Sequence, residues 1–206
     1  MEAALDRLIG IATTISRYAG WLCGFLLLFA AVLISVDIFL RATFVVTIGL
    51  APDLSSHALA IASSWGCTVA LLNRSHVRID SVYNHLSGRA RSILDMVGLI
   101  SFIYFMALVS YYAYYVLEQS IISNTHSVTT VEIPLAIPQF FWFVGFLFFL
   151  ATATLLLLRA GLAILKNDTR FVHNLIGARS AQEEVELEKE SLGVHAAPGG
   201  TKGGAA

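Results

Sequence analysis

Charged residues are scarce in this chain, and that shortage excludes an ordinary soluble domain. Asp, Glu, Lys and Arg make up 13% of the residues and hydrophobic residues 57%, whereas about 25% of a typical soluble domain is charged. Four stretches carry no charge at all: Tyr18 to Val36, Leu54 to Asn73, Met96 to Leu117 and Ile133 to Leu158. Each is at or above the roughly 18 residues that a membrane-spanning helix needs, so the sequence predicts four spans.

Regular alternation of apolar and polar residues is also missing from these stretches, which excludes the pattern of a transmembrane β-barrel. In lipid every backbone N–H and C=O must be satisfied within its own segment, so helices are the element that can cross. We therefore expect an all-α, integral membrane four-helix bundle within residues 18–175. Its spans are predicted at about 18–40, 54–73, 94–117 and 134–160.

Basic residues are nearly absent from one side of this predicted topology. The side opposite both chain ends holds only Arg41, in the first connection, and no Lys or Arg in the connection from Glu118 to Glu132. The side of the two chain ends holds Arg7, Arg17, Arg74, Arg78, Arg89, Arg91, Arg159, Lys166, Arg170 and Arg179. Because flanking basic residues stay in the cytoplasm, both termini are predicted to be cytoplasmic.

The two ends of the chain differ from the predicted membrane domain. Residues 1–17 are followed by no small-residue cleavage pattern, so we expect the first span to be retained. They form either a short amphipathic helix on the inner membrane surface or a cytoplasmic extension of the first span. Residues 176–206 are first acidic and then rich in Gly and Ala, which predicts a disordered cytoplasmic tail.

Cysteine and histidine are too few within the spans to form a cofactor site. Cys23 and Cys67 both lie inside spans, where a thiol behaves as a small apolar group, so neither a disulfide nor a metal pair is expected. His57 stands alone in the spans, and haem ligation by two histidines needs a second one at matching depth. We expect no metal, no cofactor and no catalytic residue. A haem- or quinone-linked membrane anchor of a respiratory complex remains the alternative function.

An internal repeat and a charge at mid-membrane depth are missing as well. Many secondary transporters are built from inverted repeats with broken helices at the bilayer midplane, and intramembrane ionisable residues usually mark transport pathways. The four predicted spans contain neither feature, and each is predicted to be one continuous helix. The sequence therefore favours a subunit of a transporter over a complete transporter.

The spans do contain small residues at four-residue intervals. The set comprises Gly20 and Gly24 in the first span, and Ala58, Ala62, Gly66 and Ala70 in the second. Small side chains let helix backbones approach closely in lipid, where van der Waals contact drives association. These residues are therefore candidates either for packing within the bundle or for contact with another subunit.

Charged residues and prolines mark the ends of the first and fourth spans. Asp37 and Arg41 are four residues apart with the acid first, which favours an ion pair on one helix face. Such a pair ends the helix, orders the outer loop or contacts a partner protein. Pro134 and Pro138 bracket the start of the fourth span, and proline suits the first turn of a helix but not its interior. The loop should therefore join the start of that span in one fixed conformation.

The most specific local feature is the segment that leaves the second span. It reads Asn73-Arg74-Ser75-His76-Val77-Arg78-Ile79-Asp80. In physical terms, Arg74, His76, Arg78 and Asp80 lie where a helix meets the cytoplasmic headgroups. There Arg can bind lipid phosphate and Asp can pair with a neighbouring Arg, which would anchor the helix end.

This segment resembles the small membrane subunit of tripartite ATP-independent periplasmic (TRAP) transporters, the DctQ-like family. The other similar pieces are Asp37-x-x-x-Arg41 followed by Phe44, Gly66 ten residues before His76, and Ile133-Pro134-Leu135-Ala136-Ile137-Pro138-Gln139 with Gly145 further on. The resemblance covers about residues 18–165. It departs at the start of the second helix, where the family often has an acidic and basic pair and this chain has Asp53 followed by Ser55, Ser56 and His57.

The resemblance implies a non-catalytic subunit of a sodium-coupled transporter in the bacterial inner membrane. Such a subunit pairs with a large multi-span membrane subunit that holds the substrate and sodium sites, while a periplasmic substrate-binding protein delivers an organic acid. The expected partners are these two proteins and membrane lipids, not nucleic acid. The connections from Arg41 to Asp53 and from Glu118 to Glu132 are candidates for touching the binding protein, with Asp53, Glu118 and Glu132 as docking residues.

Overall fold

The computed structural model describes residues 2–74, 88–127 and 132–166, together with residues 175 and 189. In this part of the chain the regular elements are α1 (Glu2–Phe44), α2 (Ala51–Leu72), α4 (Gly88–Ile122) and α5 (Ala136–Leu165), and no strands beyond one isolated bridge between His126 and Pro134. The predicted all-α class is therefore confirmed. The features predicted at His76, Arg78, Asp80 and, apart from Lys189, residues 176–206 lie outside the described residues.

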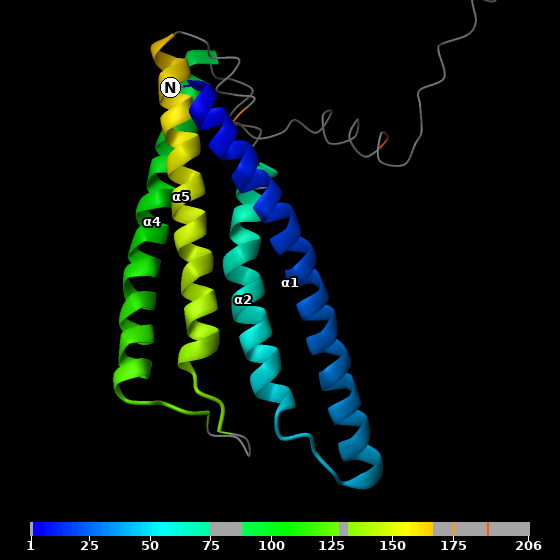
Figure 1. Ribbon diagram of the computed structural model, residues 1–206. Helices are drawn as coiled ribbons and strands as arrows, with labels where there is room; N and C mark the ends of the chain where they lie inside the picture. Colours follow the sequence, from blue (N-terminus) through cyan, green and yellow to red (C-terminus); the bar gives the residue numbers. More distant parts are fainter. Residues whose placement is uncertain (1, 75–87, 128–131, 167–174, 176–188, 190–206) are drawn as a thin grey trace, which may run out of the picture.

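Successive helices run in opposite directions, and Figure 1 shows them side by side in the order α4, α5, α2, α1. The central pair is α2 and α5; α1 packs against both of them, and α4 packs against α5. The start of α1 and the end of α5 lie at the same end of the bundle, which we call the terminal end. The connections after α1 and α4 lie at the opposite end, which we call the loop end.

Three helices among the described residues are long and apolar enough to cross a membrane: α1, Ala90–Ile122 in α4 and Ala136–Ile164 in α5. The remaining helix, α2, has 22 residues and is about 33 Å long at 1.5 Å per residue, so its length also suffices. It is less apolar because five of its side chains are the hydroxyl residues Ser55, Ser56, Ser63, Ser64 and Thr68. Two of these, Ser64 and Thr68, are fully buried, so they face protein rather than lipid.

The hydrophobic core lies between α4, α5 and the end of α2. On α5 the buried hydrophobic residues recur at alternating intervals of three and four: Phe146, Phe149, Ala153, Leu156, Ala160 and Ala163. On α4 the residues Leu99, Met106 and Ala113 are buried at seven-residue intervals. A seven-residue repeat keeps one stripe of each helix against its neighbour, as in coiled-coil packing. The rings of Phe102 and Phe149 meet edge to face, with centroids 5.0 Å apart.

Helix α1 is longer than a bilayer requires and touches the bundle along a narrow line. It runs unbroken for 43 residues, about 64 Å, so residues 2–17 continue the helix that contains the predicted first span. Apart from Ala12, its buried residues are Ser16, Cys23, Ala30 and Asp37, which are seven positions apart. Because most of these side chains are small, α1 can lie close to its neighbours while most of its large apolar side chains stay exposed.

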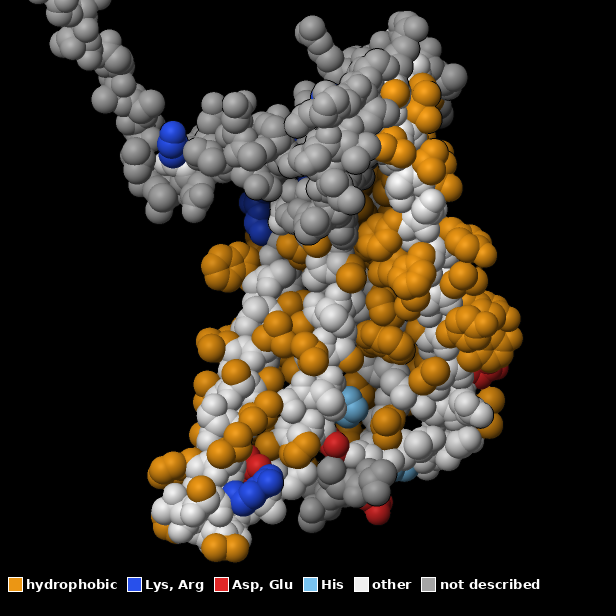
Figure 2. Space-filling view, turned by 180° about the vertical axis from the view of Figure 1, so that it is seen from behind, with side chains coloured by type: hydrophobic (Ala, Val, Ile, Leu, Met, Phe, Trp, Pro, Cys, Tyr) orange, Lys and Arg blue, Asp and Glu red, His pale blue; other side chains and the backbone are white. Residues whose placement is uncertain are grey.

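The surface of the bundle is apolar over most of its length. Figure 2 shows hydrophobic side chains spread along the helices and charged side chains toward the two ends. Trp21 and Phe25 on α1 and Tyr104 and Phe105 on α4 are more than half exposed. Soluble proteins rarely expose contiguous apolar surface on this scale, whereas lipid tails solvate such side chains well. The exposed surface therefore suits a protein whose solvent is a bilayer.

Candidate functional site

Asp37 organises the connection between α1 and α2 at the loop end. Its side chain is buried, and its Oδ2 accepts a hydrogen bond from Arg41 Nη2 at 2.7 Å. Its Oδ1 accepts from the backbone N–H of Ile48 at 2.5 Å and from Thr47 Oγ1 at 3.1 Å. The ion pair with Arg41 thus forms on one helix face, and the same carboxylate also holds the loop. Arg41 itself stays 61% exposed and is available at the surface.

Asp53 joins the two connections of the loop end. It lies in the first turn of α2, and its carboxylate accepts a hydrogen bond from the hydroxyl of Ser127, which follows α4. The segment around Ser127 is itself folded back, because the Ser127 amide donates to the Ile133 carbonyl and the Leu135 amide to the Thr125 carbonyl. The connection after α1 and the connection after α4 therefore meet at the start of α2.

The other predicted residues of the loop end lie around this junction. Glu118 is half-buried near the end of α4, and Glu132 is exposed in the connection to α5. Helix α5 starts at Ala136, between Pro134 and Pro138. Pro138 falls in the first turn, where a missing N–H costs no helical hydrogen bond, so the local sequence explains where the helix begins.

His57 and Gln139 each place a buried polar atom near the loop end. The Nε2 of His57 and the Oε1 of Gln139 are buried and have no hydrogen-bond partner among the described residues. The described part of the chain holds no group of three or more His, Cys, Asp or Glu side chains that could bind a metal. Cys23 and Cys67, each on a different helix, are free thiols.

Gly145 lies where α5 packs closely against α2. A Cβ atom at this position would lie 2.5 Å from Ser64 Oγ and 2.9 Å from Trp65 Cδ1, so only glycine fits without displacing them. The Trp65 indole donates to the Phe141 carbonyl at 3.1 Å, and its ring lies 5.5 Å from that of Phe148. The contact between the two central helices is therefore filled by a serine and a tryptophan packed over a glycine.

The small residues singled out from the sequence divide into buried and open positions. Ala58 and Ala62 are 5% and 6% exposed, so they are buried within this single chain. Gly66 and Ala70 are partly exposed, and a Cβ atom at Gly66 would meet nothing within 4 Å. On α1, a Cβ atom at Gly20 would lie 3.4 Å from Val69 Cγ2, and one at Gly24 would meet nothing within 4 Å.

At the terminal end, ion pairs tie the start of α1 to the end of α5. Arg159 Nε donates to Asp6 Oδ1 at 2.7 Å, and Lys166 Nζ lies 2.7 Å from Glu2 Oε1. The side chain of Arg159 is only 11% exposed, whereas Lys166 is 65% exposed. Arg74, from the predicted anchoring motif, lies just past the end of α2 and is half-buried.

Asp95 is a buried charged residue that sequence reasoning does not single out. It is fully buried on α4, and Ser92 on the same helix is 2% exposed. Because Asp95 directly precedes the uncharged stretch that starts at Met96, it resembles an ordinary flanking charge. The signal that could identify it is spacing: Ser92, Asp95 and Leu99 are three and four residues apart, which puts them on the same buried helix face.

Comparison with known proteins agrees with this architecture. The family model for the DctQ component of tripartite ATP-independent periplasmic transporters matches residues 29–162, which is more than half of the chain. The match starts in the second half of α1 and continues almost to the end of α5. No curated protein and no solved structure matches the chain. The chain belongs to the DctQ family and is a membrane component of a tripartite ATP-independent periplasmic transporter.

Proposed function

We propose that this protein is the small permease subunit of a sodium-coupled TRAP transporter for organic acids in the bacterial inner membrane. It acts as a non-catalytic scaffold for the large multi-span subunit, which holds the substrate and sodium sites. It also helps to dock the periplasmic substrate-binding protein. Both termini face the cytoplasm, so the loop end faces the periplasm.

The packed interior of the bundle is the observation that carries the scaffold role. Phe149, Ala153 and Ala160 on α5 have no exposed surface, and the core around them is made of apolar side chains. The buried acids among the described residues lie away from mid-helix: Asp37 accepts bonds from the loop after α1, and Asp95 is two turns into α4. A packed bundle of this kind is suited to act as the stationary partner of a moving transport domain.

The loop end is the proposed docking surface for the binding protein. The bond from Ser127 to Asp53 joins the connections Arg41–Asp53 and Glu118–Glu132 into one surface. Exposed groups of both signs are present there, namely Arg41 and Glu132. Rim charges of this kind steer encounter and set orientation more than they add affinity. We therefore expect charge reversal at these two positions to slow binding-protein association rather than to unfold the bundle.

Gly66 and Ala70 on α2 form the proposed contact with the large subunit, since they are the open part of the small-residue stripe. Gly66→Leu adds a side chain into empty space, so the isolated chain should fold normally while co-purification of the large subunit falls. Gly98→Leu on α4 is the matched control, because a Cβ atom there also meets nothing within 4 Å. Unchanged co-purification with Gly66→Leu would remove this stripe from the interface.

Reconstitution tests the scaffold role directly. Proteoliposomes containing this chain alone, the large subunit alone, or both are supplied with the binding protein, an organic acid and an inward sodium gradient. We expect accumulation of the acid only when both membrane subunits are present. Uptake by this chain alone would refute the scaffold role.

A further inference from the structure

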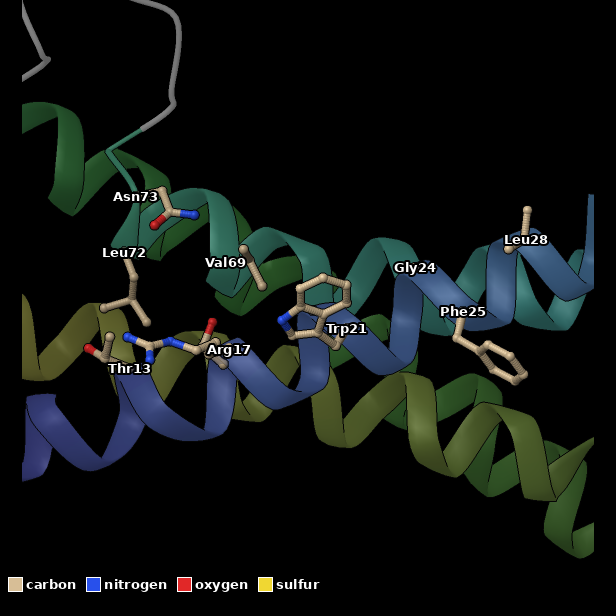
Figure 3. A pocket seen from close by; sticks show the side chains of 11 residues that line it. Thr13, Arg17, Trp21, Gly24, Phe25, Leu28, Val69, Leu72 and Asn73 are labelled. Atoms are coloured by element: carbon tan, nitrogen blue, oxygen red, sulfur yellow. The ribbon is translucent and has the colours of Figure 1, made fainter. Parts of the chain in front are cut away.

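A groove with a volume of about 650 Å³ runs between α1 and α2 in the half of the bundle nearer the terminal end. Its walls are apolar: Trp21, Phe25 and Leu28 from α1, and Val69 and Leu72 from α2. Figure 3 shows these side chains along the two helices, with the polar residues gathered toward one end of the groove. Its volume falls in the range of roughly 300–1,000 Å³ that is usual for small-molecule sites.

The groove exists because α1 has glycines where it passes α2. A Cβ atom at Gly20 would only reach ordinary contact distance from Val69, and one at Gly24 would meet nothing within 4 Å. The side chains of Trp21 and Phe25 stand beside these glycines and are 79% and 68% exposed. The result is an apolar groove with aromatic walls that no described side chain fills.

Two hydrogen-bond donors that have no partner among the described residues lie at the terminal end of this groove. Arg17 is exposed and makes no hydrogen bond or ion pair with any described residue, and the same holds for the indole N–H of Trp21. The two residues are four apart and so lie on the same helix face. Figure 3 shows the Arg17 side chain extended along the helix toward Thr13 and Leu72, with the indole nitrogen of Trp21 on that same side of its ring. A cation and a neutral donor at the terminal end of an apolar groove match an amphiphile with an anionic head.

The length of the groove along α1, compared with the thickness of the bilayer, identifies the kind of amphiphile. From Arg17 to Asp37, α1 advances about 30 Å, which is the thickness of the hydrocarbon core, so these residues lie at its two edges. From Arg17 to Leu28 it advances about 16 Å, or roughly one leaflet. A transmembrane partner helix would need a groove that continues through both leaflets. A lipid of one leaflet needs only this half.

We propose that the groove binds one anionic phospholipid of the leaflet on the terminal side, which is the cytoplasmic leaflet under the orientation that the basic residues predict. The phosphate is held by Arg17 and the Trp21 indole, and an acyl chain lies over Gly20 and Gly24. Basic pockets between transmembrane helices on the cytoplasmic side are suited to anionic headgroups. This inference goes beyond the scaffold role and does not depend on it.

Photo-crosslinking tests the site on the full chain purified in mild detergent. The probe is phosphatidylglycerol with a photoreactive acyl chain, compared at equal mole fraction with the matching phosphatidylcholine, and labelled peptides are mapped by mass spectrometry. We expect phosphatidylglycerol to label residues 20–28 and 69–72 more strongly than phosphatidylcholine does. Excess glycerol phosphate, which has the head without the chain, should not compete. Competition by it would indicate a soluble-anion site and overturn the lipid assignment.

Four variants separate the head and chain contributions. Arg17→Gln should lower phosphatidylglycerol labelling about five-fold, the effect of one basic residue at a membrane surface, while Arg7→Gln on the same helix should leave it unchanged. Gly24→Leu should abolish labelling by filling the groove, whereas Gly98→Leu should not. Equal melting temperatures of all four in detergent would show that each is folded. The proposal would be overturned if labelling survived both Arg17→Gln and Gly24→Leu. It would also be overturned if the groove crosslinked to a large-subunit helix, to a second copy or to another part of this chain.

Discussion

Helix α2 packs between α5 and α1, and each of these neighbours has a glycine facing it. The contact with α5 is close at its glycine, whereas the contact with α1 leaves a groove. Against α5, Gly145 lets Ser64 and Trp65 pack so closely that a single added carbon would collide with them. Against α1, Gly24 faces open space, and a groove remains between the helices. The comparison shows that a glycine in a membrane helix permits close approach only when the opposite helix supplies side chains that occupy the space.

The two contacts are also held by different interactions. In the contact between α2 and α5, the Trp65 ring packs against Phe148 and its indole donates a hydrogen bond to the Phe141 carbonyl. Helix α1 makes polar contacts near both of its ends, where Asp37 binds the loop into α2 and Asp6 pairs with Arg159 of α5, and between them it packs through small buried side chains such as Cys23 and Ala30. The contact at Gly145 is therefore filled by serine and tryptophan side chains, whereas the groove lies along the stretch of α1 between its two polar attachments.

The largest effect should come from breaking the close contact. Gly145→Leu forces Ser64 and Trp65 to move, and overpacking of this kind costs about 3 kcal/mol. We expect a large drop in the melting temperature of the purified chain in detergent, measured by intrinsic fluorescence. Gly98→Leu adds the same side chain where there is room and should melt like the parent.

A compensating change identifies the cause of that loss. Ser64→Gly removes both serine atoms that an added Cβ would meet, so Gly145→Ala should cost less in a Ser64→Gly background than in the parent chain. Equal costs in the two backgrounds would show that the α2 contact is not what restricts Gly145.

A smaller effect is expected from releasing the loop end of α1. Asp37→Ala removes the acceptor for the Ile48 amide and Thr47, and a hydrogen bond to a charged group contributes about 2 kcal/mol. Hydrogen exchange at Ile48 should accelerate, while amides of α5 beside Gly145 keep their protection. Arg41→Gln should have little effect, because that side chain is exposed. Faster exchange throughout α5 would mean that the two contacts of α2 are not independent.

The sequence is sufficient to predict the helices but not which small residues serve which contact. Long uncharged stretches and the lack of alternation decide the helical class, because lipid leaves no other way to satisfy the backbone. The pair of Asp37 and Arg41 follows from helix periodicity. Ala58 and Gly66 share one stripe in the sequence, yet Ala58 is buried and Gly66 has open space. That difference depends on how the neighbouring helix crosses, which a single-helix pattern does not contain.

Two other features depend on tertiary contacts in the same way. The seven-residue line of Ser16, Cys23, Ala30 and Asp37 on α1 combines polar, thiol and charged side chains, so no hydrophobic pattern reveals it. Asp95 is buried by the packing of α4 and not by its own polarity, which favours exposure. Sequence patterns identify what a helix can bury, whereas the partner helix decides what it does bury.

A modest effect is expected at the terminal end, where α1 meets α5. Asp6→Asn removes one partner of Arg159, and a partly exposed ion pair of this kind contributes about 0.5 kcal/mol. The difference in melting temperature from the parent should shrink as salt is raised, since screening weakens the pair. Arg7→Gln, which removes a charge from the same turn, is the control. A loss for Asp6→Asn that does not respond to salt would mean that the pair acts through packing rather than through charge.

The smallest effect on stability should come from filling the groove, and that near-absence of effect is what distinguishes it from the contact at Gly145. Gly24→Leu places a side chain where a Cβ atom meets nothing within 4 Å, so we expect the free energy of unfolding in detergent to change by less than about 0.5 kcal/mol. Replacing glycine by leucine within a helix also raises helix propensity, which offsets a small steric cost. If Gly24→Leu were as damaging as Gly145→Leu, the space between α1 and α2 would be closed in the folded protein, and both the comparison and the lipid site would fail together.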